Sequence, residues 1–223
     1  MGREQTNART EPASLRLSNV SIALGSKTLL TINQDVGPGD VLTVMGPSGS
    51  GKSSLLAFIA GFLDPAFTAS GDVTFQGESL IALAPEKRRV GLLFQDALLF
   101  PHMSVYQNLA FAIPKSAAGN NAQRLELVTQ ALENAGLEGL GDRDPETLSG
   151  GQKSRIALMR VLLAEPRALL LDEPFSKLDA DLRQQMRQFV FSQATKRNLP
   201  VLLVTHDAED AEAAGGQIIR LVD

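Results

Sequence analysis

A glycine-rich loop between an apolar run and a helical pattern constrains this chain more than any other feature. Residues 46–53 read Gly-Pro-Ser-Gly-Ser-Gly-Lys-Ser, which fits the pattern G-x-x-x-x-G-K-[ST]. The apolar run Val41–Met45 precedes the loop, and the helical run Lys52–Ala60 closes it. Glycines let backbone N–H groups point inward around an anion, and a helix N-terminus adds positive potential. The loop therefore predicts a phosphate site, and its context argues against a chance Gly/Ser turn.

Every residue of this loop is a candidate contact to a bound nucleotide. The predicted set comprises Gly46, Pro47, Ser48, Gly49, Ser50, Gly51, Lys52, Ser53 and Ser54. We expect Lys52 to reach the β- and γ-phosphates and the Ser53 hydroxyl to ligate Mg²⁺.

Composition sets broad limits on what else the chain can be. Its 223 residues suffice for one large domain, or for one domain with an inserted subdomain. The net charge of −4 gives no overall basic field, so we expect no nucleic-acid partner. The chain contains no cysteine, which excludes disulfides and thiolate metal sites. No run approaches 18 apolar residues, so we expect any membrane association to depend on a partner.

Continuous apolar runs alternate with helical patterns, which favours a parallel sheet in an α/β fold. The expected strands are Val41–Met45, Val90–Phe94, Ala168–Leu171 and Val201–Thr205. The expected helices are Lys52–Ala60, Asn121–Ala135, Gly151–Ala164 and Ala180–Thr195.

The stretch from about Asp96 to Leu163 has helical patterns and no convincing strand, so we interpret it as a helical insertion between two halves of the sheet. Within it, Leu125, Val128, Leu132 and Ala135 form one predicted apolar stripe.

Two adjacent carboxylates, Asp172 and Glu173, follow one of the buried strands. Neighbouring strand residues point to opposite faces, so the two would serve one site differently. We expect Asp172 to face Mg²⁺ and Glu173 to act on the attacking water as general base. Alone, such a pair would more often be a solvated acidic turn, but the phosphate loop upstream calls for an acidic partner.

A second candidate anion site lies far from the first. Ser149, Gly150, Gly151 and Gln152 begin an apolar-periodic helix, so free N–H groups and a hydroxyl meet at its N-terminus. Simple helix capping by Ser149 is the alternative, and the two roles are compatible.

The phosphate loop, the Leu-Ser-Gly-Gly-Gln sequence at 148–152 and the Leu-Leu-Leu-Asp-Glu-Pro sequence at 169–174 together resemble ABC ATPases, over essentially residues 15–222. The resemblance implies an α/β P-loop NTPase fold: a RecA-like parallel sheet core with an antiparallel β subdomain and an inserted helical subdomain. It implies a flexible tail at 1–14 and a nucleotide-binding domain at 15–223. The core would span about 15–95 and 164–223, and the helical subdomain about 96–163.

The resemblance also assigns roles residue by residue. Gln95 falls at the family's Q-loop glutamine, Ser176–Asp179 at its D-loop and His206 at its switch histidine. The implied catalytic residues are Glu173, His206, Gln95 and Lys52. The implied metal ligands are Ser53, Gln95 and Asp172, and the cofactors are ATP and Mg²⁺. The implied nucleotide contacts beyond the phosphate loop are Leu24, Ser149, Gly150, Gly151, Gln152 and Asp179.

ABC ATPases form head-to-tail dimers, so Ser149 and Gly151 of one subunit would close over the ATP held by the other. One departure from the family pattern is Leu24, which stands where an adenine-stacking aromatic residue is usual. Stacking would be lost there, and we expect weaker discrimination of ATP from GTP.

The segments Glu86–Gly91 and Leu98–Asn108, on either side of Gln95, resemble bacterial importer ATPases. The implied partners are a transmembrane permease, a second ATPase chain that we expect to be an identical copy, and a periplasmic solute-binding protein. The implied location is the cytoplasmic face of the inner membrane. The chain stops soon after its last expected strand, which indicates a minimal cassette without a C-terminal regulatory domain.

Other readings stay open at this point. A small ABC exporter, a lipoprotein-release ATPase or a soluble ABC protein would carry the same motifs. A GTPase would share the phosphate loop, and Ser176–Asp179 faintly resembles its base-reading N-K-x-D motif. The Leu-Ser-Gly-Gly-Gln sequence has no role in a GTPase.

Overall fold

The computed structural model describes residues 13–221, so most of the tail predicted at 1–14 lies outside the described residues. The strands are β1 (Leu15–Leu24), β2 (Lys27–Val36), β3 (Val41–Met45), β4 (Phe67–Phe75), β5 (Glu78–Ser79), β6 (Val90–Leu93), β7 (Ala168–Asp172), β8 (Val201–Thr205) and β9 (Gln217–Arg220). The helices are α1 (Lys52–Ala60), α2 (Pro85–Arg88), α3 (Val105–Ala112), α4 (Asn121–Asn134), the 3₁₀ turn η1 (Pro145–Thr147), α5 (Gly150–Leu163), α6 (Ala180–Lys196) and α7 (Ala208–Ala214).

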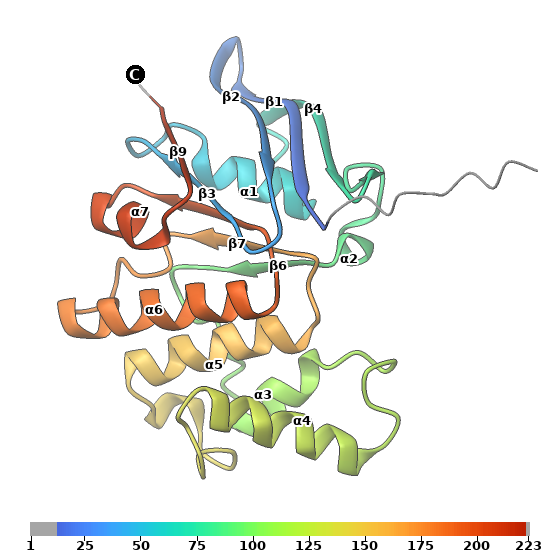
Figure 1. The fold of residues 1–223 in the computed structure, drawn as a ribbon, viewed down its shortest axis with the longest axis vertical. Coiled ribbons are helices and arrows are strands. Elements are labelled where there is room, and N and C mark those ends of the chain that lie inside the picture. The colour runs from blue at the N-terminus through green and yellow to red at the C-terminus, as the bar shows by residue number, and fades with distance from the viewer. Residues whose placement is uncertain (1–12, 222–223) are drawn as a thin grey trace, which may run out of the picture.

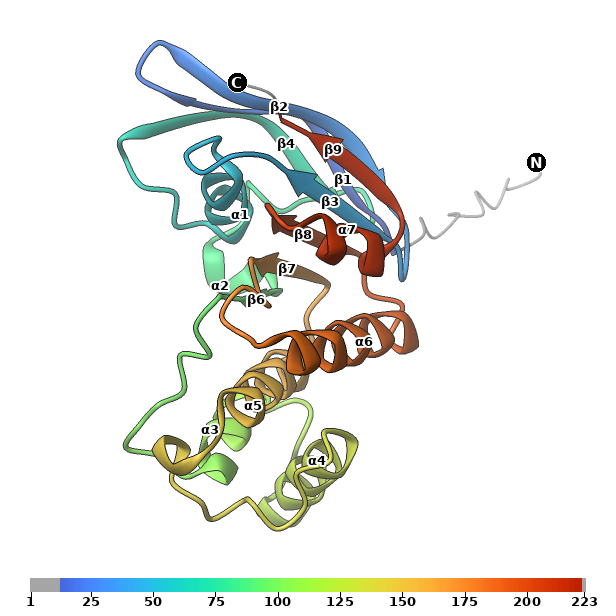
Figure 2. The same cartoon turned by 90° about the vertical axis from the view of Figure 1, so that its left-hand side faces the viewer.

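Two sheets and several helices stack in layers along the long axis of the molecule (Figures 1 and 2). The antiparallel sheet has the order β2-β1-β4-β5, and the parallel sheet has the order β6-β7-β8-β3-β9. Helix α1 lies between the two sheets, and α5 and α6 cover the other face of the parallel sheet. Beyond α5, at the far end of the long axis, lie α3 and α4.

Alternating side chains of the central strands fill two separate cores. On β7, Leu169 and Leu171 pack with α5 and α6, whereas Ala168 and Leu170 face α1 and the antiparallel sheet. The residues of β8 divide in the same way. A strand buried on both faces must be apolar at every position, which explains the continuous apolar runs.

Most predicted elements are confirmed. The strands at 41–45 and 201–205 and the helix at 52–60 match residue for residue, and the other five expected elements differ by one residue at one or both ends. The prediction that Leu125 belongs to the buried apolar stripe is wrong, because its side chain is 54% exposed. Val128, Ala131 and Leu132 form the buried face of α4 instead.

The antiparallel sheet stands over the phosphate loop. A β-carbon placed on Gly51 would lie 3.1 Å from Cβ of Leu29 in β2, so strand and loop are in close contact. Gly51 has φ +88°, where glycine avoids the strain that a side chain would bring. The parallel core, antiparallel subdomain and inserted helices predicted from the family resemblance are confirmed.

Between residues 96 and 163 the structure contains α3, α4, η1 and α5 and no strand. The domain boundaries given above stay a prediction. Within residues 13–221, no helix has both the length and the apolar character needed to cross a bilayer.

Candidate functional site

The phosphate loop joins β3 to α1. Lys52 is 5% exposed, and its Nζ donates to the carbonyl oxygens of Gly46 and Pro47, both at 2.8 Å. These bonds hold the ammonium inside the loop. Gly51 caps α1 without a side-chain hydrogen bond, so the first N–H groups of the helix are left for an anion.

Ser53 and Asp172 meet beside this loop although 119 positions separate them in the sequence. The Ser53 hydroxyl, on the first turn of α1, donates to Oδ1 of Asp172 at 3.0 Å. Asp172 is the last residue of β7, whose neighbours in the sheet are β6 and β8. A hydroxyl and a carboxylate are hard oxygen donors, which fits Mg²⁺ completed by phosphate oxygens and water.

Burial raises the pKa of Asp172 above that of an ordinary aspartate, and the neighbouring Glu173 carboxylate adds to the rise. The hydrogen bond from Ser53 and the charge of Lys52 oppose it. Ser53 and Lys52 therefore do not fully offset the cost of burying the negative charge of Asp172. A bound cation would supply the missing stabilisation of that charge.

Glu173 turns away from β7 by an unusual backbone conformation, with φ +44°. Its N–H donates to the carbonyl of Val204, and its carbonyl accepts the Ser176 hydroxyl at 2.9 Å. Its Oε1 lies 3.1 Å from Nδ1 of His206, which follows the neighbouring strand β8. Strained conformations of this kind persist where surrounding bonds hold them, and they concentrate at functional sites.

Gln95 follows β6 and is exposed. It lines a depression of about 430 Å³ together with Ser53, Asp172 and Glu173. The structure thus brings the predicted metal ligands and the predicted base to one depression, at the edge of the parallel sheet where β6 and β7 end.

The second predicted anion site lies elsewhere. Ser149 and Gln152 cap α5 reciprocally, with each side chain accepting from the backbone N–H of the other. Helix α5 lies on the opposite face of the parallel sheet from α1, so the two devices do not converge within one chain (Figure 2). Gly151 is buried against Leu182 of α6, where a β-carbon would overlap the leucine methyl groups. Asp179 caps α6 by accepting from the Leu182 N–H at 2.9 Å.

Comparison with known proteins decides the family. The ABC transporter family profile matches residues 29–176. This chain belongs to the ABC transporter family. It is the ATP-binding and ATP-hydrolysing subunit that powers transport. Membership of this family implies a transmembrane permease as partner.

Three relatives illustrate the similarity. An uncharacterized ABC transporter ATP-binding protein, YnjD of Escherichia coli K12, is 48% identical over 89% of this chain and 91% of its own length. The sulfate/thiosulfate import ATP-binding protein CysA of Pseudomonas putida is 40% identical over 92% of this chain, which spans only 63% of CysA. The thiamine import ATP-binding protein ThiQ of Aliivibrio fischeri is 42% identical over 83% of this chain and 77% of its own length.

Among solved structures, cbiO1 of Clostridium perfringens, part of the ABC transporter complex cbiONQ, matches with a TM-score of 0.77. It is 27% identical and is covered over 84% of its length by 93% of this chain. The ABC ATPase fold is thereby shown from structure as well as from sequence.

Leu24 lies at the end of β1, opposite Lys27 and Phe67, and is 46% exposed. Its contact with adenine stays a prediction.

Sequence reasoning missed the ion pairs around this site. Lys177 pairs with Asp96 at 2.5 Å, which joins the segment after Gln95 to the segment before α6. Arg183 and Arg187 of α6 both form ion pairs with Asp207, the residue after His206. The only available signal was the four-residue spacing of the two arginines on a predicted helix.

Proposed function

We propose that this chain hydrolyses Mg²⁺-ATP at a site completed by a second copy, and that the cycle powers import of a small solute. The observation that carries the proposal is the meeting of Ser53 with Asp172 and of Glu173 with His206 beside one phosphate loop. These groups come from α1, β7 and β8, so only the folded chain brings them together.

In this proposal each group has a separate task. The backbone N–H groups of the loop and Lys52 bind the β- and γ-phosphates. Ser53, Asp172 and Gln95 hold Mg²⁺, which when bound would neutralise charge on the phosphate oxygens. Glu173 accepts a proton from the attacking water, and His206 orients Glu173 and contacts the γ-phosphate.

A second copy of the chain completes the site. The capped end of α5 presents the N–H groups of Gly150 and Gly151, and it lies beside the start of α6, where Asp179 is found. Helices α5 and α6 begin on the same side of the molecule (Figure 1), and both lie on the opposite face of the parallel sheet from α1, which follows the chain's own phosphate loop. A head-to-tail pair places this edge over the partner's ATP.

Exposed apolar side chains on the helical layer support docking of a permease. Leu98 is 57%, Phe111 67% and Leu125 54% exposed, on or between elements that follow Gln95. Large apolar side chains left exposed on neighbouring elements are candidates for contact with a protein partner. The import direction and a periplasmic solute-binding protein are proposed because CysA and ThiQ are named as import ATP-binding proteins, and a position at the cytoplasmic face of the membrane is proposed on the same ground.

Glu173→Gln tests the catalytic part of the proposal. The variant keeps the shape of the side chain but loses the basic carboxylate, so we expect ATP binding to persist while turnover falls by about 100-fold or more. Phosphate release and equilibrium nucleotide binding are measured on the same preparation. Turnover within a few-fold of the unmodified chain would remove Glu173 from the role of general base.

Affinity purification from detergent-solubilised membranes of the source organism tests the transport part. We expect a multi-spanning membrane protein to co-purify in fixed ratio. Its recovery should fall when Phe111 and Leu125 are both replaced by serine, with Ile218→Ser as the exposed apolar control on β9, at the opposite edge of the parallel sheet from β6. Recovery of soluble proteins alone would favour a non-transport ABC ATPase.

A further inference from the structure

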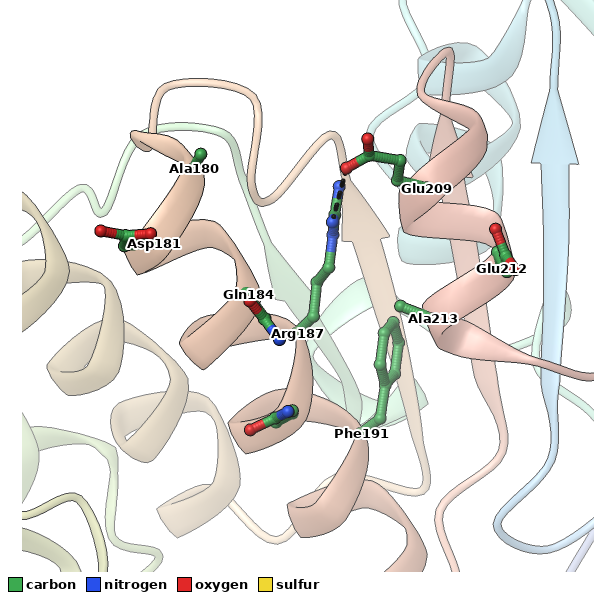
Figure 3. Close-up of a pocket in the computed structure, with 9 residues that line it drawn as sticks. Ala180, Asp181, Gln184, Arg187, Phe191, Glu209, Glu212 and Ala213 are labelled. Atoms are coloured by element: carbon green, nitrogen blue, oxygen red, sulfur yellow. Dashed lines mark hydrogen bonds and ion pairs between the residues drawn. The ribbon is translucent and has the colours of Figure 1, made fainter.

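Two buried charged side chains, Arg187 of α6 and Asp210 of α7, have no part in the chemistry proposed above. They are 8% and 2% exposed. Arg187 Nε donates to Oδ1 of Asp210 at 2.6 Å, and Arg187 Nη1 donates to Oε2 of Glu209 at 3.1 Å. Figure 3 shows Arg187 reaching from α6 to Glu209 across the groove between the two helices. Burying two charges costs hydration that their attraction only partly returns, so such a pair points to a role in fixing one conformation.

The pair continues into the loop that carries His206. The hydroxyl of Thr205, a residue 1% exposed at the end of β8, donates to Oδ2 of Asp210 at 3.0 Å. The same hydroxyl accepts the backbone N–H of Asp207 at 3.0 Å. Both neighbours of His206 are therefore held by one chain of hydrogen bonds that begins at Arg187 and passes through Asp210 and Thr205. We call this chain of hydrogen bonds the relay.

A second arm starts one turn earlier on α6. Arg183 donates to Oδ2 of Asp207 at 3.1 Å and to the carbonyl of Leu178 at 3.0 Å. Helix α6 thus holds the His206 loop and the segment that leads to Asp179 at the same time. The side chain of His206 itself is 61% exposed, so packing restrains it little. The backbone on either side therefore sets the position from which its imidazole reaches Glu173.

We infer that Arg187, Asp210 and Thr205 are positioning residues for His206. They fix the backbone at 205–207 so that the imidazole meets Glu173 and the γ-phosphate. The inference rests on the role proposed for His206. A reacting group displaced by about 1 Å can lose about 100-fold in rate, so a loosened relay is expected to lower turnover and leave ATP affinity intact.

Thr205→Val is the first variant, because it keeps the shape of the side chain and removes only the hydroxyl. We expect kcat to fall between about 10-fold and 100-fold with KM for ATP unchanged. Thr205→Ser retains the hydroxyl and should restore most of the turnover. Thr43→Val is the matched control, since Thr43 is also fully buried, on the adjacent strand β3, and its hydroxyl has no hydrogen-bond partner in the part of the chain that the structure describes.

A second variant guards against simple unfolding. Arg187→Met combined with Asp210→Leu removes both charges together, which buried pairs often tolerate. We expect it to fold, as judged by thermal unfolding, and to show the same loss of kcat as Thr205→Val. Full turnover in this folded variant would overturn the inference.

The deciding experiment repeats Thr205→Val in a His206→Ala background, with phosphate release measured at saturating Mg²⁺-ATP. If Thr205 acts through His206, the substitution lowers kcat in the unmodified chain and causes no further loss in His206→Ala. An equal loss in both backgrounds, or no loss in either, overturns the inference. Full turnover in His206→Ala alone would refute the proposed role of His206 and the inference with it, and that result is visible in the single variant.

Discussion

At the scale of single residues, Asp172 is needed for the proposed metal site but lowers the stability of the fold when it is ionised. It lies at the end of a buried strand, where its charge is poorly hydrated, and next to the like-charged Glu173. Because its pKa is raised, the folded chain binds this proton more readily than the unfolded chain. The ionised carboxylate therefore opposes folding, and stability attributable to this group falls as the pH rises through the interval between the two pKa values.

Asp172→Asn should accordingly stabilise the nucleotide-free protein and abolish Mg²⁺-dependent turnover. We expect a higher unfolding temperature than that of the unmodified chain at about pH 8, and a difference that shrinks as the pH is lowered and Asp172 itself takes up a proton. Thermal unfolding in the presence of a chelator measures this. Asp142→Asn, at an exposed loop position, is the control and should show no such gain. A lower unfolding temperature for Asp172→Asn at alkaline pH would contradict the argument.

The sequence predicted the residues of the site better than their contacts. Motif spacing marked Ser53 and Asp172, and the structure places them 3.0 Å apart. The relay from Arg187 to Thr205 could not be predicted, because it depends on how α6 and α7 lie against each other. Arg187 and Asp210 belong to no motif identified in the sequence, and burial of a charge cannot be read from its residue type.

At the level of elements, a buried arginine donates hydrogen bonds to the carbonyl groups at the C-terminal end of α1. Arg88 is 7% exposed, and it donates to the carbonyl oxygens of Phe58 at 2.7 Å, Ile59 at 2.9 Å and Leu83 at 3.0 Å. The last carbonyls of a helix have no partner within the helix and carry partial negative charge. Arg88 satisfies them and fixes the helix that presents Lys52 and Ser53.

Replacing Arg88 by alanine should lower the free energy of unfolding by about 2–4 kcal/mol, because buried carbonyls lose a charged donor. Lys87→Ala, at the exposed neighbouring position, should change it by less than about 0.5 kcal/mol. Chemical denaturation of both variants measures the difference. Equal effects at the two positions would mean that the hydrogen bonds of Arg88 contribute nothing specific.

Elements buried on both faces were the easiest to predict. β3 and β8 match the expected ranges because continuous apolar runs leave little freedom in their boundaries. β1 was harder, since its pairing shifts between Leu17 and Val20 and Asn19 adopts φ +49°. A bulge of this kind breaks the two-residue alternation on which strand prediction depends. The antiparallel sheet was therefore expected only from the family resemblance.

At the level of the whole molecule, one chain carries two predicted phosphate-binding segments on different faces of its parallel sheet. The phosphate loop precedes α1, and Ser149–Gln152 begin α5 on the other face. Within one chain the two segments do not converge, which supports the proposal that a second copy supplies the missing half of each site. The sequence indicated this arrangement through family resemblance, whereas the separation of the two segments required the structure.

Site-specific cross-linking can show whether two copies share each ATP site, because the chain contains no cysteine of its own. Ser48→Cys and Ser149→Cys are placed in separate chains that also carry Glu173→Gln, and ATP binding by each is verified first. The chains are mixed with Mg²⁺-ATP and a short bismaleimide. We expect a covalent dimer in the mixture that requires ATP and is absent from either variant alone. No dimer in the mixture, or the same dimer from one variant by itself, would contradict a site shared head to tail between two copies.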